Sequence, residues 1–343
     1  MGLDIGDIVP RRAIDFSELK GKTISIDAFN IIYQFLSTIR QPDGTPLMDS
    51  KKRITSHLSG LFYRNINLMQ DGIKLAYVFD GQPPELKYLT NQKRIEHKEQ
   101  ARQKYEHARD EEDLEAMGKY ARQNVHLTNE ILEDSKELLK AMGVCVIQAP
   151  SEGESQAAYL AKKGKCFAVG SQDYDSLLFQ APILIQNLTL ARKRKTPSGF
   201  VYISPEVIEL QHVLNSLQIN LDQLICLGIL AGTDYNPGGI HGIGQKKALD
   251  IVRKLKEPYI IFKSFEEQIK KQEAEDRGFD WQEVYELFHK PSVRDFEIEF
   301  PKFNESKIKQ ILVEEHEFSE ERINNALEKL NFTKEKQKQK TLF

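Results

Sequence analysis

Four short apolar segments of this chain are each followed within four residues by an acidic residue, and stretches with helical periodicity lie between them. The four segments are 23–26, 75–79, 144–148 and 167–169. Their β-branched and apolar character predicts strands, whereas residues 29–39 and 55–71 repeat apolar side chains at helical spacing. Such alternation favours an α/β fold, with a mostly parallel, twisted central sheet that helices cover on both faces.

The second half of the chain continues this pattern and then changes. Residues 183–188 and 200–203 predict further strands, separated by the basic run 192–195. After residue 203 the sequence predicts helices alone.

The acidic residues that follow the first four strands are the most informative pattern in the sequence. They are Asp27, Asp80, Glu152, Glu154, Asp173 and Asp175. Because the carboxyl ends of parallel strands form the ligand crevice of such sheets, we expect these side chains to lie together. Neighbouring carboxylates repel one another unless cations compensate, and sites made only of oxygen suit Mg²⁺ or Mn²⁺. A site this acidic predicts two ions, the arrangement that catalyses phosphodiester hydrolysis.

Each acidic residue also has an ordinary structural explanation. Asp27 would cap the following helix, Ser151 and Glu154 fit a capping box, and Asp173 and Asp175 suit a turn. Six independent caps and turns at equivalent places in one sheet are a poor explanation, so we favour the metal site.

Residues 87–137 differ in composition from the rest of the chain. They are charged, helix-prone and poor in large apolar side chains. They predict either a solvated helical hairpin or a mobile lid whose basic first section, residues 87–109, meets a polyanion.

A glycine-rich turn lies between two helix-prone stretches in the second half of the chain. Gly242 and Gly244 allow close approach of the backbone to a ligand, and N–H groups at a helix start bind phosphate without reading sequence. Lys246 and Lys247 occupy the first helical turn, where the helix dipole disfavours cations. We therefore expect a phosphate contact here; the plain alternative is a turn between two helices.

Composition argues against several classes of protein. With 40% hydrophobic and 29% charged residues, the chain suits a folded globular protein. No apolar run approaches the length of a membrane span, and we expect no signal peptide. Three scattered cysteines argue against a disulfide framework and favour a reducing intracellular compartment. The formal charge of −3 leaves nucleic-acid binding to the distribution of charge.

The motifs and their order are similar to those of the structure-specific 5′ nucleases, and within them of the archaeal and eukaryotic flap endonucleases. The resemblance extends from Met1 to about residue 330, and the matching segments are 25–28, 77–81, 149–154, 171–175, 232–235 and the glycine-rich turn. It implies a PIN-like nuclease core with a helical arch and a helix-hairpin-helix element. The single nuclease domain that it implies, residues 1–332, has four divisions. These are an N-terminal region (residues 1–86), an arch or cap (residues 87–137), an internal region (residues 138–260) and a helical region (residues 261–332), and a flexible basic tail (residues 333–343) follows them.

The resemblance also implies a role for the carboxylates and for two cations. The six carboxylates together with Asp234 would surround two Mg²⁺ ions, with Mn²⁺ as a substitute. Lys87 and Arg94 lie two helical turns apart on one face and would neutralise charge at the scissile phosphate.

The DNA contacts implied by the resemblance are Gly2, Tyr33, Arg40, Thr55, Gly242, Gly244, Lys246 and Lys247. Tyr33 would stack on the base beside the cut, and Arg40 and Thr55 would belong to a pocket for a one-nucleotide 3′ flap. A K⁺ ion at the glycine-rich turn would link the backbone to a phosphate of the downstream duplex.

The end of the chain departs from the family pattern. Gln339, Leu342 and Phe343 begin a motif for the sliding clamp PCNA, but the chain stops before the usual aromatic pair. A long basic extension of the eukaryotic kind is missing too, which favours an archaeal, cytoplasmic protein. We expect a monomer.

The resemblance implies a Mg²⁺-dependent flap endonuclease and 5′–3′ exonuclease acting in lagging-strand maturation and DNA repair. It would cut double-stranded DNA that carries a 5′ flap, about one nucleotide into the duplex. The alternatives are a related 5′ exonuclease or junction-cutting enzyme, a non-catalytic DNA-binding scaffold, and a phosphatase. A scaffold would not need the carboxylates, Lys87 and Arg94, and a phosphatase has no use for the glycine-rich turn.

Overall fold

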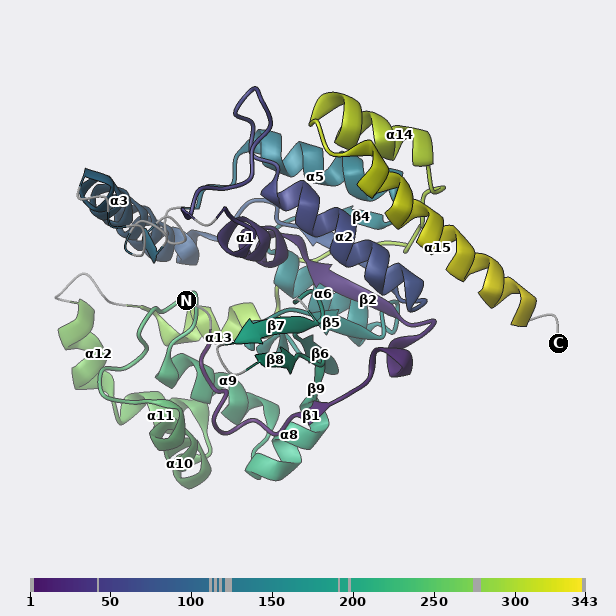
Figure 1. The fold of residues 1–343 in the computed structure, drawn as a ribbon. Helices are drawn as coiled ribbons and strands as arrows, with labels where there is room; N and C mark the ends of the chain where they lie inside the picture. The colour runs from purple at the N-terminus through teal and green to yellow at the C-terminus, as the bar shows by residue number, and fades with distance from the viewer. Residues whose placement is uncertain are drawn as a thin grey trace.

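A seven-stranded sheet in the order β1-β9-β6-β5-β2-β3-β4 runs through the middle of the molecule (Figure 1). The structure is a computed structural model, and it describes residues 3–41, 43–110, 113, 116, 119–120, 125–190, 192–196, 199–273 and 279–340. The strands of the sheet are β1 (Arg12–Ala13), β2 (Thr23–Asp27), β3 (Lys74–Phe79), β4 (Cys145–Gln148), β5 (Ala168–Gly170), β6 (Ile183–Gln186) and β9 (Glu206–Glu209). A separate antiparallel hairpin consists of β7 (Lys193–Thr196) and β8 (Gly199–Tyr202).

Five neighbouring strands of the sheet, β4, β3, β2, β5 and β6, are parallel. At the other edge β9 is antiparallel to β6, and β1 is antiparallel to β9. The predicted α/β class is therefore confirmed, with a mixed sheet whose larger portion is parallel. Parallel strands share one carboxyl edge, and Asp27 at the end of β2 pairs in register with Val78 of β3, two residues before Asp80.

Helices pack against both faces of the sheet. The helices of the described residues are α1 (Ala28–Thr38), α2 (Ser56–Gln70), α3 (Tyr88–Asp110), α5 (Asn129–Ala141), α6 (Gly153–Lys162), α7 (Asp175–Leu178), α8 (Leu210–Leu217), α9 (Leu221–Ala231), α10 (Gln245–Leu255), α11 (Pro258–Lys263), α12 (Glu266–Glu273), α13 (Trp281–His289), α14 (Glu305–Lys309) and α15 (Glu320–Lys340), and not all of them contact the sheet. Short helical turns lie at Phe16–Leu19, Glu85–Lys87 and Gln310–Glu315.

Two apolar cores result, one on each face. Side chains of α1, α2, α5 and α15 form the core on one side, and those of α6, α7, α9, α10 and α13 form the core on the other. The burial of apolar side chains on both faces accounts for the continuous apolar character of β2 and β3, because each face of these strands meets a helical layer.

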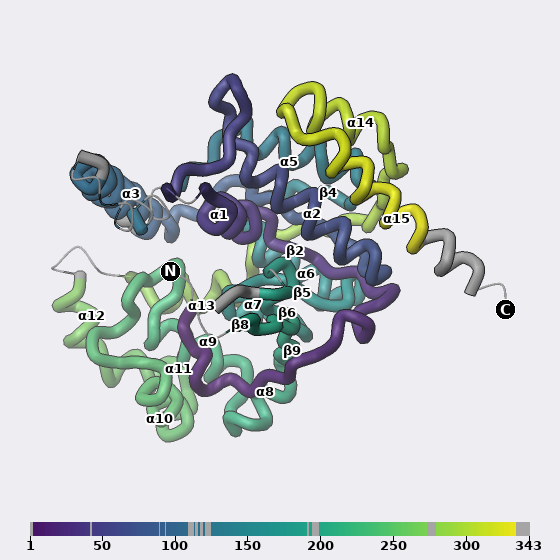
Figure 2. Tube along the Cα trace, viewed as in Figure 1, coloured from purple at the N-terminus to yellow at the C-terminus, as the bar shows by residue number. Residues whose placement is uncertain are grey.

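The long helix α3 extends away from this body in the tube view (Figure 2). Few of its described side chains are buried. The segment expected as a flexible tail from residue 333 is helical as far as Lys340. A portion of the predicted arch, and Gly2, Leu342 and Phe343, lie outside the described residues.

Two predictions about secondary structure were wrong. Helices alone were expected after residue 203, but β9 follows there, and residues 290–304 form neither helix nor strand. The basic run was expected to separate two strands, whereas residues 193–196 form β7.

In the described ranges, no single helix is long and apolar enough to cross a membrane, and α8 and α9 meet that test only jointly, across an 82° bend.

Candidate active site

The carboxyl edge of the parallel strands gathers the predicted acidic side chains. Asp27 ends β2, Asp80 follows β3, and Glu152 and Glu154 lie at the start of α6. Asp173 lies between β5 and α7, Asp175 begins α7, and Asp234 follows α9. These carboxylates are close enough to repel one another. After burial, which is the larger cause, the charges of Asp80 and Asp173 raise the pKa of Asp27, and the charge of Asp175 raises the pKa of Glu154. The sequence prediction that these residues lie together is thus met by the fold.

Burial and mutual repulsion disfavour the charged form of several of these groups. Burial, and then the charge of Glu152, raise the pKa of Asp80 to about 6. Burial, and then Asp234, raise the pKa of Asp175 to about 8. Burial raises the pKa of Glu154 well above its usual value too. A site with so much uncompensated negative charge favours a cation.

Hydrogen bonds from the protein satisfy some of the oxygens of the site. The Gly153 N–H donates to Asp80 Oδ1 at 2.7 Å. A Cβ at Gly153 would lie 2.6 Å from that oxygen, so this close approach needs glycine. Asn30 donates from its backbone N–H to Asp27 Oδ1 at 3.2 Å and from Nδ2 to Asp173 Oδ2 at 2.6 Å. Asp27 is therefore the cap of α1, as its simpler interpretation proposed, while it also belongs to the cluster.

Two buried carboxylate oxygens remain without a partner, Glu154 Oε1 and Asp175 Oδ1. Buried polar atoms are nearly always hydrogen-bonded, so unpartnered oxygens in an acidic cluster fit ligands of a hard divalent cation. With the side chains as they stand, no three acidic, His or Cys groups in the described ranges converge closely enough to hold a metal ion. The donor chemistry fits metal binding, and coordination would require these side chains to reorient.

The capping box that was the alternative explanation of Ser151 and Glu154 does not form at the start of α6. Glu152 is the cap residue and its side chain makes no capping bond. The Ser151 hydroxyl instead donates to the Gln82 carbonyl at 3.0 Å. Glu154 therefore does not cap the helix, and its carboxylate belongs to the acidic cluster.

One face of α3 and of the turn before it supplies cations to the site. Lys87 pairs with Glu152 and lies 3.3 Å from Asp234 Oδ2, and Arg94 contacts the same Asp234 oxygen at 2.7 Å. Although burial opposes the effect, Lys87 and Arg94 lower the pKa of Asp234 to about 2. The predicted pair of cations is thus at the acidic cluster, bound to two of its members.

Three polar residues of the site were missed in the sequence. Tyr235 donates its hydroxyl to Glu152 at 2.8 Å, Asn30 bonds Asp173, and Thr90 donates its hydroxyl to the Asp234 carbonyl. Tyr235 had a usable signal, since it directly follows Asp234 in a matching segment. Asn30 and Thr90 lie one turn from Asp27 and Lys87 on their helices, a weaker signal.

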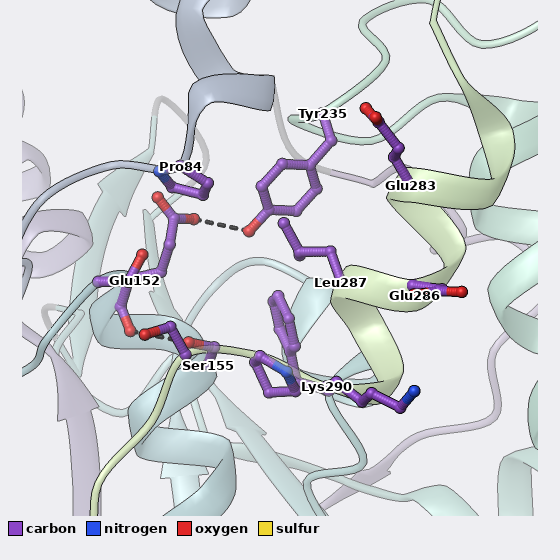
Figure 3. A pocket seen from close by; sticks show the side chains of 12 residues that line it. Pro84, Glu152, Ser155, Tyr235, Glu283, Glu286, Leu287 and Lys290 are labelled. Carbon is purple, nitrogen blue, oxygen red and sulfur yellow. Dashed lines mark hydrogen bonds between the residues drawn. The ribbon is translucent and has the colours of Figure 1, made fainter.

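A cavity of about 370 Å³ borders the outer side of this cluster (Figure 3). Glu152 and Tyr235 form one wall, and Glu283, Glu286 and Leu287 of α13 form another.

The other predicted contact residues lie outside the acidic cluster. Tyr33 is 36% exposed on α1, with the Lys98 ammonium 5.8 Å from its ring centroid. Arg40 donates to the carbonyls of Leu36 and Gly44, and Thr55 is buried immediately before α2. Gln339 is in the last turns of α15.

The glycine-rich turn connects α9 to α10, which pack against each other. Gly242 has φ +77° and is exposed, and Gly244 caps α10 without a side-chain bond. Lys246 and Lys247 are exposed in the first turn. The same loop carries Asp234 at its start, so it connects the acidic cluster to the turn.

We expect the metal-free protein to become less stable as the pH rises from about 4 to about 8. The pKa values of Asp80 and Asp175, about 6 and about 8, are raised above the unfolded value near 3.9. Between the unfolded value and its own folded-state value, each carboxyl group binds more protons in the folded state, so the stability present at low pH is lost by the time the pH passes about 6 for Asp80 and about 8 for Asp175. Asp234 has the opposite sign, but its contribution is already complete above pH 5.

Thermal unfolding in EDTA at several pH values measures this effect. A divalent cation should raise the melting temperature more at pH 8 than at pH 6, because it compensates the ionised carboxylates. A melting temperature that climbs with pH in EDTA would contradict the electrostatic description.

Two protein-family domains match the parts of the chain that contain the acidic cluster. The XPG N-terminal domain matches residues 6–101, and the XPG I-region matches residues 143–234. Flap endonuclease 1 of Pyrococcus furiosus is 52% identical over 100% of this chain and 98% of its own length. That of Thermococcus onnurineus is 51% identical with the same coverage.

Solved structures agree with these matches. Flap endonuclease-1 from Methanococcus jannaschii has a TM-score of 0.73 at 40% identity, covering 97% of this chain and 98% of its own. The catalytic core of Rad2 in complex with DNA substrate has a TM-score of 0.70 at 20% identity, covering 96% of this chain and 100% of its own, which supports the fold alone.

Proposed function

Since this chain belongs to the flap endonuclease family, we propose how its own residues bind metal ions and DNA. Membership in this family establishes that the protein is a structure-specific flap endonuclease of DNA replication and repair. Such an enzyme hydrolyses phosphodiester bonds of DNA. Nucleases of this family depend on divalent metal ions. What we propose is which residues carry out each step.

The acidic cluster is the metal site in this proposal. Two Mg²⁺ ions, or Mn²⁺ in their place, would be held by Asp27, Asp80, Glu152, Glu154, Asp173, Asp175 and Asp234. The observation that carries it is the pair of buried, unpartnered oxygens on Glu154 and Asp175 within a cluster of raised pKa values. When bound, two such ions supply Lewis-acid stabilisation of the attacking and leaving oxygens.

Lys87 and Arg94 would act on the scissile phosphate. Both already lie at the acidic edge, and each is bound there by Asp234. A phosphate that approaches the site would take over one or both cations from the carboxylate, and their charge would then stabilise the developing charge of the transition state.

The remaining surface would hold DNA through its backbone and shape. Gly242, Gly244, Lys246 and Lys247 would bind a phosphate of the downstream duplex, with a K⁺ ion at the turn, and this contact reads no sequence. Tyr33 would stack on the base beside the cut, and Arg40 and Thr55 would receive a one-nucleotide 3′ flap. Residues 87–137 would form the arch over the 5′ strand, within the domain divisions expected above.

Three other assignments belong to the proposal. Gly2 would contact DNA near the site, the segment from Gln339 to Phe343 would bind the sliding clamp, and the protein would act as a monomer.

Cleavage of three labelled DNAs in Mg²⁺, with an EDTA control, tests the proposed function. The substrates are a double-flap junction, a nicked duplex and a four-way junction. We expect one product from the double flap, cut about one nucleotide into the duplex, and no product in EDTA. Progressive shortening of the nicked duplex, or paired cuts in the four-way junction, would instead indicate a related 5′ exonuclease or a junction-cutting enzyme.

A further inference from the structure

Tyr235 links two groups of the active site through one carboxylate oxygen. Its hydroxyl donates to Glu152 Oε2 at 2.8 Å (Figure 3). Lys87 pairs with that same oxygen. The Lys87 ammonium also lies 5.4 Å from the centroid of the Tyr235 ring, within the range of a cation–π interaction. Tyr235 therefore contacts both partners of the Lys87–Glu152 ion pair.

The tyrosine itself is held firmly. Its side chain is 4% exposed, and its ring meets Phe288 edge-on at a centroid distance of 5.4 Å and Phe179 at 6.4 Å. Its backbone N–H donates to Thr233 Oγ1 at 3.1 Å. The aromatic packing fixes the ring, and the fixed ring places the hydroxyl.

Glu152 is buried as well, with 6% of its surface exposed, and together with Tyr235 it lines the cavity of about 370 Å³ beside α13 (Figure 3). Its carboxylate has open space on that side. The position of its carboxylate therefore depends on its polar partners, which are Tyr235 and Lys87.

We propose that Tyr235 is a positioning residue, whose hydroxyl holds Glu152 Oε2 and leaves Oε1 available to a metal ion. Sharing Oε2 with the tyrosine also keeps Lys87 from pairing with both oxygens of Glu152, so that the ammonium remains available to a phosphate. Because hydrogen-bonding partners of metal ligands orient them, their loss weakens metal binding and activity. This inference rests on the proposed metal site.

The variant Tyr235→Phe removes the hydroxyl and retains the ring. We expect a single-turnover rate about tenfold lower and Mn²⁺ binding, followed by electron paramagnetic resonance, about tenfold weaker. The dissociation constant for the double-flap DNA, measured in Ca²⁺, should change less than about twofold, because Tyr235 is only 4% exposed and offers little surface to a ligand.

Tyr77→Phe is the matched control. Tyr77 is equally buried, and its hydroxyl donates to Asn65 Oδ1 at 2.9 Å in the core on the other face of the sheet. Both variants lose one buried hydrogen bond, so both should unfold at a somewhat lower temperature. A role confined to stability would affect both alike, whereas the proposal expects slower cleavage and weaker Mn²⁺ binding in Tyr235→Phe alone.

A double variant tests whether Tyr235 acts through the ion pair. In a Lys87→Met background, adding Tyr235→Phe should slow cleavage clearly less than it does in the wild-type protein, since the two residues share Glu152. Full additivity, or a Tyr235→Phe variant that matches Tyr77→Phe in rate and Mn²⁺ binding, would overturn the proposal. A wild-type protein that bound no Mn²⁺ would overturn the metal site as well, which separates the two failures.

Discussion

Flap cleavage by Asp175→Asn is expected to be slower than that of the wild-type protein by about a thousandfold, the upper range for the loss of one electrostatic group. Asp175 is 2% exposed, and its Oδ1 has no hydrogen-bond partner. Asparagine has the same shape but lacks the negative charge that a divalent cation requires. Binding of the flap DNA should remain measurable, because the phosphate contacts proposed for the glycine-rich turn are untouched.

The same variant has a second, opposite signature. Burial and Asp234 raise the pKa of Asp175 to about 8, so its ionisation costs stability in the metal-free protein. Asp175→Asn should therefore unfold in EDTA at a higher temperature than the wild-type protein at pH 9, and it should gain less from added Mg²⁺.

Asp295→Asn provides the control, since this surface carboxylate pairs with Lys165 outside the site. It should cleave within threefold of the wild-type rate. If Asp175→Asn also cleaved at that rate, the assignment of the acidic cluster as the metal site would be wrong.

The second large effect is expected from Lys87→Met. Its single-turnover rate should fall by about a hundredfold, because an ammonium that stabilises the charge developing at phosphorus is lost. The flap dissociation constant should rise much less, since one phosphate contact is a small fraction of the interface. The metal-free variant should also unfold at a lower temperature, because Glu152 loses an ion-pair partner in a buried position.

Arg102→Met is a suitable comparison on the same helix. Arg102 pairs with Glu99 and Glu106 along α3, exposed to solvent. Its replacement should leave the single-turnover rate within about threefold. Equal losses in the two variants would indicate that α3 contributes general positive charge and that Lys87 has no specific place in the reaction.

The parallel strands of the sheet could be predicted from sequence because they are buried on both faces. Thr23–Asp27 and Lys74–Phe79 lie within a residue of the predicted bounds. By contrast, β9 consists of Val207 and Ile208 between two glutamates, a pattern that short helices share. It is a strand because it pairs with β6, and such long-range pairing leaves little trace in a local sequence.

In the site, too, features that depend on local sequence could be predicted, and features that depend on distant partners could not. The acidic residues could be predicted because each follows a recognisable strand and the topology brings strand ends together. Ser151 and Glu154 have the spacing of a capping box, but the hydroxyl of Ser151 bonds Gln82 from the preceding crossover, a partner that spacing cannot reveal. Tyr235 was missed for a similar reason, because its partner Glu152 is distant in the sequence.

The docking of α3 on Glu152 and Asp234 has a thermodynamic consequence. Lys87, Thr90 and Arg94 hold the helix to the acidic edge through these two residues. A metal ion that binds the oxygens of Glu152 and Asp234 must displace Lys87 and Arg94 from them. A DNA phosphate that binds Lys87 and Arg94 must displace the same two carboxylates. Each ligand therefore breaks the ion pairs that oppose binding of the other, and by linkage each raises the affinity for the other by the same factor. Metal and DNA should therefore bind with positive cooperativity even where they do not touch.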